Sequence, residues 1–366
     1  MSDKFQIDGH KLSYHPQRVA TLLDAQQSWQ AARDLYPLYV EISPVGACNH
    51  RCTFCAVDYI GYQPVRFEEA TLIQRIEEMG ALGVKSIMFA GEGEPLLHKG
   101  ISRIAAATKA AGVDVAFTSN ATVLPKDFID LALPQTAWFK ASINAATAAT
   151  YAQIHQTAAE DFSKAIDHLK RMVAARNAQR LDTVIGAQIL LLPENRAEIE
   201  QLATICRDEI GLDYLVVKPY SQHRFSLTQT YAEQRYDDLA ALDERLARFN
   251  SDRFSLIFRR HTMEKMAETT LPYSRCRATP MLWAYVMADG RVFSCSAYLL
   301  DDRFALGNLQ QDSFQALWQG EKRQENWRFV RDKLDIQQCR RNCRMDEVNR
   351  YLHRLLEEPP LHVNFI

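Results

Sequence analysis

Apolar residues follow two different spacings between residues 39 and 220. Short apolar runs predict strands, and longer segments with apolar residues three or four positions apart predict amphipathic helices. The expected strands span residues 39–43, 85–90, 113–118, 137–143, 183–192 and 214–218. The expected helices include residues 67–82, 100–111, 159–176 and 196–210. Strands that alternate with helices predict an α/β fold with a parallel sheet, in which chemistry takes place at the carboxyl ends of the strands.

The last quarter of the chain predicts a second, smaller unit. Residues 283–288 and 291–293 predict two strands joined by Asp289-Gly290, a pair that favours two-residue hairpin turns. Residues 313–320 and 346–357 have helical spacing. We therefore expect an N-terminal extension (1–38), an α/β unit (39–225), a helical connector (226–270) and an α+β unit (271–366).

Charge and composition exclude several classes of protein. The 366 residues carry 43 basic and 45 acidic side chains, a formal net charge of -2. This balance argues against a protein that binds nucleic acid through bulk electrostatics. No apolar run reaches the roughly 18–20 residues that span a bilayer, and the N-terminus does not have the pattern of a signal peptide. The sequence predicts a soluble cytoplasmic protein with no nucleic-acid or membrane partner.

The eight cysteines fall into a group of three, a single residue and a group of four. In the cytoplasm they are not expected to form disulfides. Cys48, Cys52 and Cys55 form a C-x3-C-x2-C pattern, Cys206 stands alone in an apolar helical run, and the last group is Cys276, Cys295, Cys339 and Cys343. Short spacings of this kind bring thiolates together on a metal or an iron–sulfur cluster. Cys206 is expected to be a buried, inert thiol.

Two kinds of metal centre fit these groups. A [4Fe–4S] cluster with three cysteine ligands leaves one iron open, and a small molecule with an amine and a carboxylate can chelate that iron. Zinc is the alternative, with His50 as a fourth ligand at the first group or with the four cysteines of the second group in a tetrahedral site.

Residues 46–55, Gly-Ala-Cys-Asn-His-Arg-Cys-Thr-Phe-Cys, resemble the signature of radical S-adenosylmethionine (SAM) enzymes, including Phe54 directly before the third cysteine. The resemblance implies a partial (β/α)6 TIM-like barrel over residues 39–225. It also implies a [4Fe–4S] cluster on Cys48, Cys52 and Cys55, with SAM on the open iron.

The resemblance extends to residues 90–95, Ala-Gly-Glu-Gly-Glu-Pro, which are similar to the family's glycine-glutamate-proline segment. It implies that Glu94 holds the SAM amino group and that Gly91 and Gly93 allow a close backbone approach. Relatives usually have adjacent glycines, whereas Glu92 separates them here, and Ala121 replaces a glycine that often follows the third strand. The other expected SAM contacts are Phe54, Ser119, Asn120, Ser142, Asn144, Gln188 and Lys218, and each of the six polar residues also fits a purely structural hydrogen bond.

The second cysteine group resembles the auxiliary-cluster extension of the SPASM/twitch subgroup, as does the segment Phe-Ala-Leu-Gly-Asn-Leu at residues 304–309. Full SPASM domains carry seven cysteines and two clusters, so four cysteines imply one auxiliary [4Fe–4S] cluster in a twitch-like α+β domain. A fully ligated auxiliary cluster cannot bind substrate without losing a thiolate, so the resemblance implies that this cluster transfers electrons. Arg340, Arg341 and Arg344 beside the last pair either neutralise that cluster, bind a phosphate on the substrate or face solvent.

The resemblance implies reductive cleavage of SAM to a 5′-deoxyadenosyl radical, which abstracts a substrate hydrogen. We expect oxidation or epimerisation of a small polar substrate such as a sugar, nucleotide sugar or aminocyclitol, with a flavodoxin- or ferredoxin-type electron donor. Modification of a peptide or protein side chain is the alternative, although fewer than 40 residues precede the first strand, which is short for a leader-binding domain. A non-catalytic zinc or iron–sulfur scaffold is the third alternative. Lys218, Tyr220 and His223 are further candidates to face the substrate.

Overall fold

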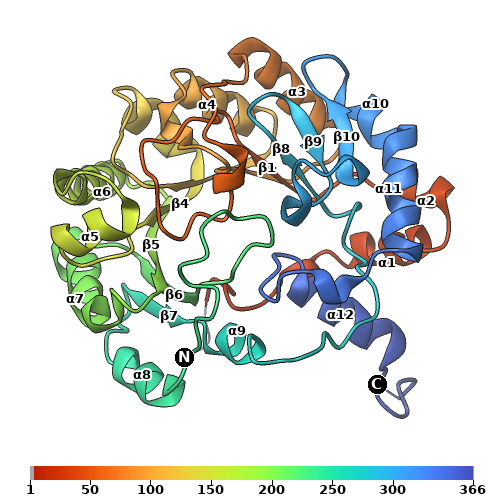
Figure 1. The fold of residues 1–366 in the computed structure, drawn as a ribbon. Helices are drawn as coiled ribbons and strands as arrows, with labels where there is room; N and C mark the ends of the chain where they lie inside the picture. The colour runs from red at the N-terminus through yellow and green to blue at the C-terminus, as the bar shows by residue number, and fades with distance from the viewer. Residues whose placement is uncertain (1–3, 366) are drawn as a thin grey trace.

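The computed structural model describes residues 4–365 and contains one ten-stranded sheet (Figure 1). The strand order is β10-β9-β8-β1-β2-β3-β4-β5-β6-β7. The eight neighbouring strands β8, β1, β2, β3, β4, β5, β6 and β7 pair in parallel. At the β8 edge, β9 pairs antiparallel with both β8 and β10. The strands are β1 Tyr39–Ile42, β2 Ser86–Phe89, β3 Asp114–Ser119, β4 Thr136–Ser142, β5 Val184–Leu191, β6 Tyr214–Pro219, β7 Ser255–Phe258, β8 Trp283–Val286, β9 Arg291–Phe293 and β10 Ala305–Asn308.

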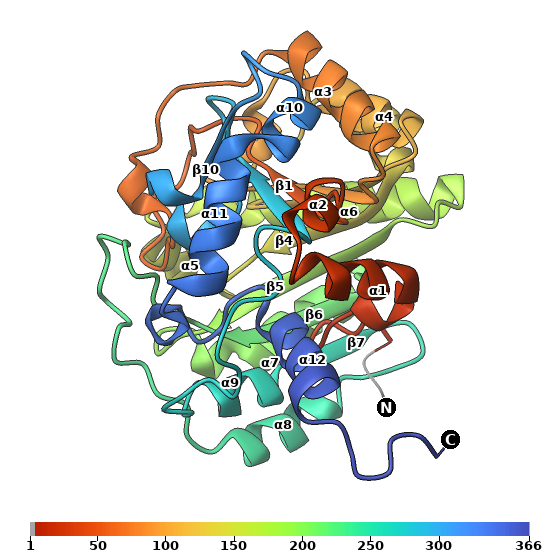
Figure 2. The same ribbon diagram turned by 90° about the vertical axis from the view of Figure 1, so that its right-hand side faces the viewer.

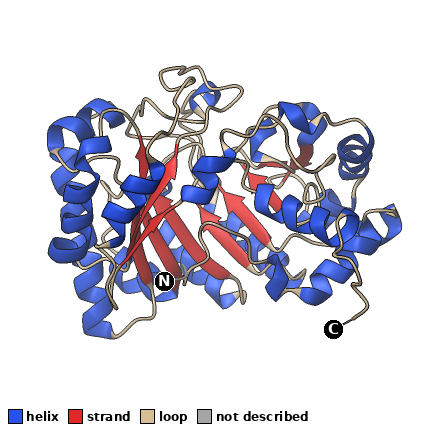
Figure 3. Cartoon of the chain, turned by 90° about the horizontal axis from the view of Figure 1, so that it is seen from below, coloured by secondary structure: helices blue, strands red, loops and turns tan. Residues whose placement is uncertain are grey.

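Helices cover the outer face of the curved sheet, as the view from below shows (Figure 3). Those that connect the parallel strands are α3 Glu69–Ala81, α4 Ile101–Ala110, α5 Ala148–His155, α6 Glu160–Gln179, α7 Ile199–Thr204, α8 Leu239–Ala247 and α9 Arg260–Lys265. The chain begins with α1 Pro16–Ala25 and α2 Trp29–Arg33 and ends with α10 Phe314–Gln319, α11 Glu321–Asp332 and α12 Asp346–Glu357. This arrangement confirms the predicted α/β fold with a partial barrel.

The pleat of the strands separates the outer face of the sheet from the interior of the barrel. Successive side chains of a strand point to opposite faces. Val40, Ile42, Phe89, Phe117 and Phe139 lie on the outer face and form the main hydrophobic core with the helices. Residues at the alternate positions, such as Glu41 on β1 and Lys140 on β4, therefore face the interior of the barrel.

The two predicted units share one sheet. Strand β8, from the C-terminal unit, pairs in parallel with β1, and β7 comes from the segment that the sequence predicted as a helical connector. An open edge on β1 would leave backbone N–H and C=O groups unpaired, and β8 covers that edge. The N-terminal extension packs with the C-terminal unit, because Leu22, Ala25 and Ala32 share a hydrophobic cluster with Trp283. Figure 2 shows α1 and α2 on that side of the molecule.

Within residues 4–365, every helix is too short or too polar to cross a membrane.

Candidate active site and metal centres

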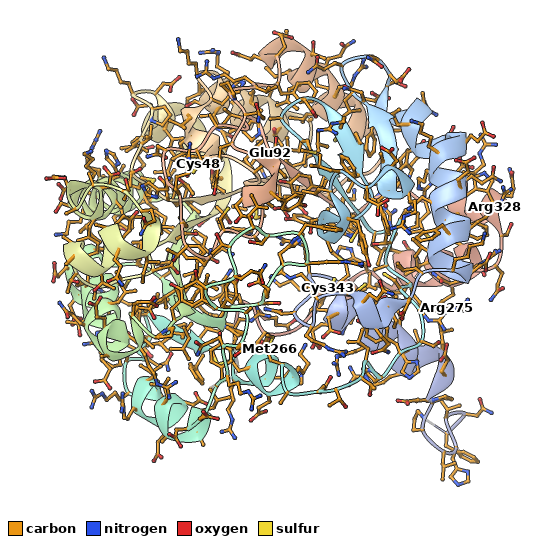
Figure 4. The ribbon with its side chains drawn as sticks, viewed as in Figure 1. Cys48, Glu92, Met266, Arg275, Arg328 and Cys343 are labelled. Atoms are coloured by element: carbon orange, nitrogen blue, oxygen red, sulfur yellow. The ribbon has the colours of Figure 1, made fainter. Side chains whose placement is uncertain are left out.

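The first cysteine group lies in the loop that follows β1. Cys48, Cys52 and Cys55 are all partly buried free thiols. The backbone N–H groups of Arg51 and Thr53 donate to carbonyl oxygens at the end of α5 (3.1 and 2.9 Å), and these bonds fix the loop over the carboxyl end of the sheet. Figure 4 labels Cys48 at this end of the barrel.

Burial raises the pKa of all three thiols. The pKa of Cys48 rises to about 12, mainly through burial and then through the nearby Glu94 carboxylate. The pKa of Cys52 rises well above its usual value through burial and the charges of the other two cysteines, and burial also raises the pKa of Cys55. Thiolates are therefore stable here only with a cation bound to them. Three thiols that influence one another in this way suit the ligand set of a [4Fe–4S] cluster with one open iron.

Glu94 lies beside this loop with its carboxylate buried and oriented. Oε1 accepts hydrogen bonds from the Leu96 N–H (3.0 Å) and the Ser119 hydroxyl (2.7 Å), and Oε2 accepts one from the Asn120 N–H (2.8 Å). The Glu94 N–H donates to the Ala47 carbonyl (2.9 Å), which ties it to the cysteine loop. Burial raises the pKa of Glu94, and the three donors oppose that shift. An ionised carboxylate has about four lone-pair sites, so these bonds leave one on Oε2 for an ammonium donor.

Close packing against the cysteine loop explains both glycines beside Glu94. A Cβ on Gly93 would lie 2.1 Å from the Val45 carbonyl oxygen and 2.4 Å from that of Ala47. Gly91 has φ +116°, a backbone conformation that favours glycine, and a Cβ there would lie 2.4 Å from the Ser43 Cβ. The intervening Glu92 accepts a hydrogen bond from the Ala288 N–H (2.9 Å) and so links this loop to the end of β8.

We expect Gly93→Ala to destabilise the protein by about 1–3 kcal/mol, because its Cβ would overlap backbone atoms that cannot move without the cysteine loop. Chemical denaturation should show this loss, together with lower iron retention after reconstitution. Gly9→Ala is the control, since a Cβ at Gly9 meets no atom within 4 Å. Equal stability and iron content in both variants would contradict the packing argument.

Ser119 and Asn120 meet Glu94 from the end of β3. The Asn120 side chain also donates to the Asn49 side chain (2.8 Å) and accepts from the Thr122 N–H (3.0 Å). Ala121 has φ +60°, so the position where relatives often carry glycine keeps the left-handed conformation with an alanine. The structure thus brings together Glu94, Ser119 and Asn120, and adds Asn49, which sequence reasoning missed.

His155, at the end of α5, contacts the cysteine loop at Cys52. Its Nδ1 lies 3.2 Å from the Cys52 Sγ, and its Nε2 accepts a hydrogen bond from the Asn144 N–H (3.4 Å). Because Nε2 is the acceptor, the ring proton lies on Nδ1 and points to the sulfur. The sequence offers no local signal for this contact, since Cys52 and His155 are 103 positions apart.

His50 lies next to this pair. Its Nε2 is 3.4 Å from the Asp161 carboxylate, and its ring packs edge-on against His155. The ligand atoms of His50, Cys52 and His155 lie within 4.8 Å of one another, a set that differs from the zinc alternative, in which His50 joins the three cysteines. With its Nε2 accepting from the Asn144 N–H, His155 would instead donate from Nδ1 to Cys52 when that sulfur ligates a cluster.

We expect His155→Phe to shift the midpoint potential of the first cluster to a more negative value, because an N–H donor to a ligating sulfur stabilises the reduced form. The phenyl ring can keep the stacking on Tyr151. A lost hydrogen bond of about 1–1.5 kcal/mol corresponds to a shift of roughly 45–65 mV for a one-electron couple. Redox titration followed by EPR measures the potential, with His261→Phe as the exposed control. An unchanged potential in His155→Phe would exclude this role.

Three of the other predicted SAM contacts form a chain of hydrogen bonds across the interior. The Lys218 Nζ donates to the Gln188 Oε1 (2.8 Å), and the Gln188 Nε2 donates to the Ser142 Oγ (2.7 Å). Asn144 is buried, and its Oδ1 accepts from the Leu190 N–H (2.8 Å), so its side chain joins β4 to β5. Phe54 packs edge-on against His155, with 5.5 Å between ring centroids.

The second cysteine group lines a cavity in the C-terminal unit. Cys276, Cys295, Cys339 and Cys343 all contribute to its wall, which encloses about 480 Å³ of atom-free space including open solvent. Burial raises the pKa of Cys339 to about 11 and that of Cys343 to about 12. Burial also raises the pKa of Cys295, and the charges of the other three cysteines add to the shift. Four thiols around one cavity suit a fully ligated cluster or zinc.

Three donors surround these thiols. The Asn349 Nδ2 lies 3.4 Å from the Cys276 Sγ, and the Asn349 Oδ1 is fixed by the Arg277 N–H (2.7 Å), which directs the amide group to the sulfur. The Tyr298 hydroxyl lies 3.6 Å from the Cys339 Sγ, and the Met345 N–H lies 3.5 Å from the Cys343 Sγ. Sequence reasoning missed Asn349 and Tyr298.

The segment of residues 220–236, which follows β6, contacts both cysteine groups. The Ser226 hydroxyl donates to the Cys55 carbonyl (3.0 Å), and the Arg224 guanidinium donates to the Gln338 side chain (3.1 Å) beside Cys339. In Figure 4 this segment runs between the labelled Cys48 and Cys343. The two groups therefore lie on either side of one segment at the same end of the barrel.

Cys206 lies apart from both groups. It is fully buried in a π-helical turn, Ile205–Ile210, within the main hydrophobic core. Burial alone raises the pKa of its thiol, as the sequence predicted for an inert cysteine.

Comparisons with known families agree with these two groups. Residues 42–206 match the model of the radical SAM superfamily, and residues 276–344 match the model of the SPASM iron–sulfur cluster-binding domain. The chain belongs to the radical SAM superfamily. Its C-terminal unit places it among the radical SAM enzymes with a SPASM domain, and membership in these families implies iron–sulfur clusters and SAM binding.

Among curated relatives, the chain is 31% identical over 219 residues to a GTP 3′,8-cyclase of Stenotrophomonas maltophilia and 26% identical over 213 residues to that of Chlorobaculum tepidum. The first match covers 54% of this chain and 57% of the relative, and the second covers 57% of this chain and 61% of the relative. The chain therefore spans less than two thirds of the length of either relative.

Solved structures show the same fold. Streptococcus suis SuiB bound to S-adenosylmethionine superposes with a TM-score of 0.63 at 17% identity, over 81% of this chain and 68% of that one. The anSMEcpe structure with bound AdoMet superposes with a TM-score of 0.54 at 16% identity, over 79% and 82%.

Proposed function

We propose that this radical SAM enzyme oxidises or epimerises a small polar substrate, such as a sugar, a nucleotide sugar or an aminocyclitol. In this proposal Cys48, Cys52 and Cys55 hold the cluster that binds SAM. Cys276, Cys295, Cys339 and Cys343 hold one auxiliary [4Fe–4S] cluster that transfers electrons. The physiological reductant is a flavodoxin- or ferredoxin-type protein in the cytoplasm.

One observation carries the proposal: segment 220–236 contacts both cysteine groups. A substrate next to this segment is within reach of both centres, so one centre can start a radical reaction and the other can exchange an electron with the substrate radical. A non-catalytic scaffold does not require this arrangement, and the family membership also argues against a scaffold.

When bound, the first cluster and SAM supply the radical that removes a hydrogen atom from the substrate. The residues of the chain bind SAM and the substrate, orient them and shield them from water. Glu94 accepts the SAM ammonium group at the free site on Oε2, while Ser119 and Asn120 hold the carboxylate in place. Phe54 and His155 close the loop from one side. Ser142, Gln188 and Lys218 offer polar groups at successive strand ends, and segment 220–236 excludes water between the two groups.

Modification of a peptide is the second candidate. The structure of SuiB bound to the precursor peptide SuiA superposes with a TM-score of 0.61, over 78% of this chain and 65% of that one. This similarity is one of fold, at 18% identity. The curated relatives carry the name of a cyclase that acts on a nucleotide and are the more similar in sequence, which supports a small-molecule substrate.

The two-cluster assignment is tested by Cys276→Ala. We expect this variant to lose about four iron atoms per chain and to retain the first cluster, because one missing thiolate opens a fully ligated cluster to loss. Iron and sulfide analysis after anaerobic reconstitution measures the loss, and inductively coupled plasma analysis for zinc tests the alternative metal. Cys206→Ala is the matched control, since that buried thiol is remote from both groups.

Reduction of the wild-type protein with dithionite in the presence of SAM should release 5′-deoxyadenosine. If none forms with a full complement of iron, the enzyme assignment fails. If Cys276→Ala keeps all its iron, or if the second centre contains zinc, the auxiliary-cluster assignment fails while the first site stands.

A further inference from the structure

The interior of the barrel contains a group of positively charged side chains, of which the proposed function uses only Lys218. Lys140 on β4 and Lys218 on β6 face the interior, because they alternate with core residues such as Phe139 and Val217. Arg259 follows β7 on the same face. Arg340 and Arg344, from the segment that carries the last two cysteines, contact Ser221 after β6 and Glu41 on β1, respectively. Figure 1 looks into this interior, with β4 and β6 on the left and α12 on the right.

These five cations lie close enough to repel one another. Burial lowers the pKa of Lys218 well below its usual value, and the charges of Lys140, Arg259, Arg344 and Arg340 lower it further. Burial also lowers the pKa of Lys140 to about 8, with Arg344 and Arg259 adding to the shift and Glu41 opposing it.

Two carboxylates face this group, and each is already paired. Arg259 binds Asp8 (3.0 Å), and Arg344 binds Glu41 (2.7 Å). Among the residues that the structure describes, the Lys218 Nζ donates only to the neutral Gln188 side chain.

The two remaining cations have neutral neighbours as well. Arg340 donates to the Ser221 carbonyl (2.8 Å), and the Lys140 Nζ lies 5.2 Å from the centre of the Trp138 ring. Within residues 4–365, Lys140, Lys218 and Arg340 therefore have no carboxylate partner within 4 Å.

Positively charged side chains without a carboxylate partner cost free energy in the interior. They lose a proton more readily, as the lowered pKa values of both lysines indicate, or they gain a bound anion that stabilises the charge. Solvent reaches this space, since Lys140 and Lys218 are only partly buried and the Arg344 side chain is 42% exposed. Arg340 lies beside Cys343, so the second centre explains part of its placement. Lys140 lies on β4 and Lys218 on β6, outside the two segments that carry the cysteine groups.

We infer that the barrel interior binds a phosphate group of the substrate through Lys140, Lys218 and Arg340. Three unpaired cations match a multiply charged phosphate better than a single carboxylate, and the planar guanidinium of Arg340 can donate two parallel hydrogen bonds to phosphate oxygens. This inference rests on the proposed function and narrows its substrate to phosphorylated small molecules such as sugar phosphates and nucleotide sugars. The phosphate would lie between the two cysteine groups, because Gln188 joins Lys218 to the end of β4 and Arg340 adjoins Cys339.

Binding of inorganic pyrophosphate to the cluster-loaded protein, measured by isothermal titration calorimetry without SAM, tests the inference. We expect pyrophosphate to bind the wild type and to bind Lys140→Gln and Lys218→Gln at least about tenfold more weakly. Lys140→Arg keeps the positive charge and should retain most of the affinity. Lys109→Gln is the control, because Lys109 is exposed and paired with Asp114.

Equal affinity in the wild type and in both interior variants would overturn the inference and indicate an adventitious ion only. Tighter binding of citrate than of pyrophosphate would also overturn it, in favour of a polycarboxylate. Because the assay does not involve SAM, its failure is separate from a failure to release 5′-deoxyadenosine, which would instead sink the proposed function. Thermal unfolding of each variant checks that a loss of binding is not a loss of folding.

Discussion

Replacement of Cys48, Cys52 and Cys55 together by alanine is expected to abolish SAM cleavage and to leave about one cluster per chain. The three thiols lie in one loop and influence one another's charge, so their removal takes away the entire protein ligand set of the first centre. The second group lines its own cavity and should keep its cluster. Release of 5′-deoxyadenosine, quantified by liquid chromatography after dithionite reduction, should fall below detection, and iron content should fall by about four atoms per chain.

The control for the triple variant is Cys206→Ala, which removes a thiol from the hydrophobic core and should change neither iron content nor cleavage. Cleavage that persists in the triple variant would show that another group binds SAM. A loss of all iron would show that the two centres are not independent, and far-UV circular dichroism would then distinguish unfolding from coupled cluster loss.

Glu94→Gln should weaken SAM binding by roughly 10- to 100-fold, since a hydrogen bond between an ammonium group and a carboxylate contributes about 1.5–3 kcal/mol. Glutamine also places an amide NH2 group against at least one of the present donors, the Leu96 N–H, the Ser119 hydroxyl or the Asn120 N–H. Equilibrium dialysis of SAM against the anaerobically reconstituted protein measures the change.

The matched control for this variant is Glu78→Gln. The Glu78 carboxylate also accepts two backbone N–H groups, those of Phe314 and Gln315 (2.9 Å each), but it joins α3 to α10 on the outside of the barrel. Its SAM affinity should equal that of the wild type. If Glu94→Gln binds SAM as tightly as the wild type with a full complement of iron, Glu94 does not hold the ammonium group.

Local patterns were enough to predict the strands of the barrel. The structure has β1 to β6 within two residues of the expected bounds, because each strand is an apolar run that is long enough for its burial to be recognised. The strand β7 was missed within the predicted connector, although it is as long as β1 and β2, because its apolar run was assigned to a segment predicted to be helical and such a run fits either a strand or part of a helix. The pairing of β8 with β1 was also missed, because it joins residues more than 240 positions apart and no local pattern encodes it.

The residues of the candidate site likewise fall into those that a local motif predicted and those that only tertiary contacts reveal. The spacing of the cysteines and the segment around Glu94 predicted residues that the fold brings into one loop and one neighbouring turn. His155, Asn49, Asn349 and Lys140 carry no motif, and their importance depends on contacts across the fold.

The sequence by itself determined the class of this protein and the grouping of its cysteines, because the short spacing of Cys48, Cys52 and Cys55 keeps these thiols in one loop whatever surrounds it. Only the tertiary structure decided that both groups face one segment, that His155 donates to Cys52, and that cations from β4, β6 and the C-terminal segment share one interior. The physical reason is that charge and hydrogen bonding act over a few ångströms in space, while these residues are separated by up to about two hundred positions along the chain.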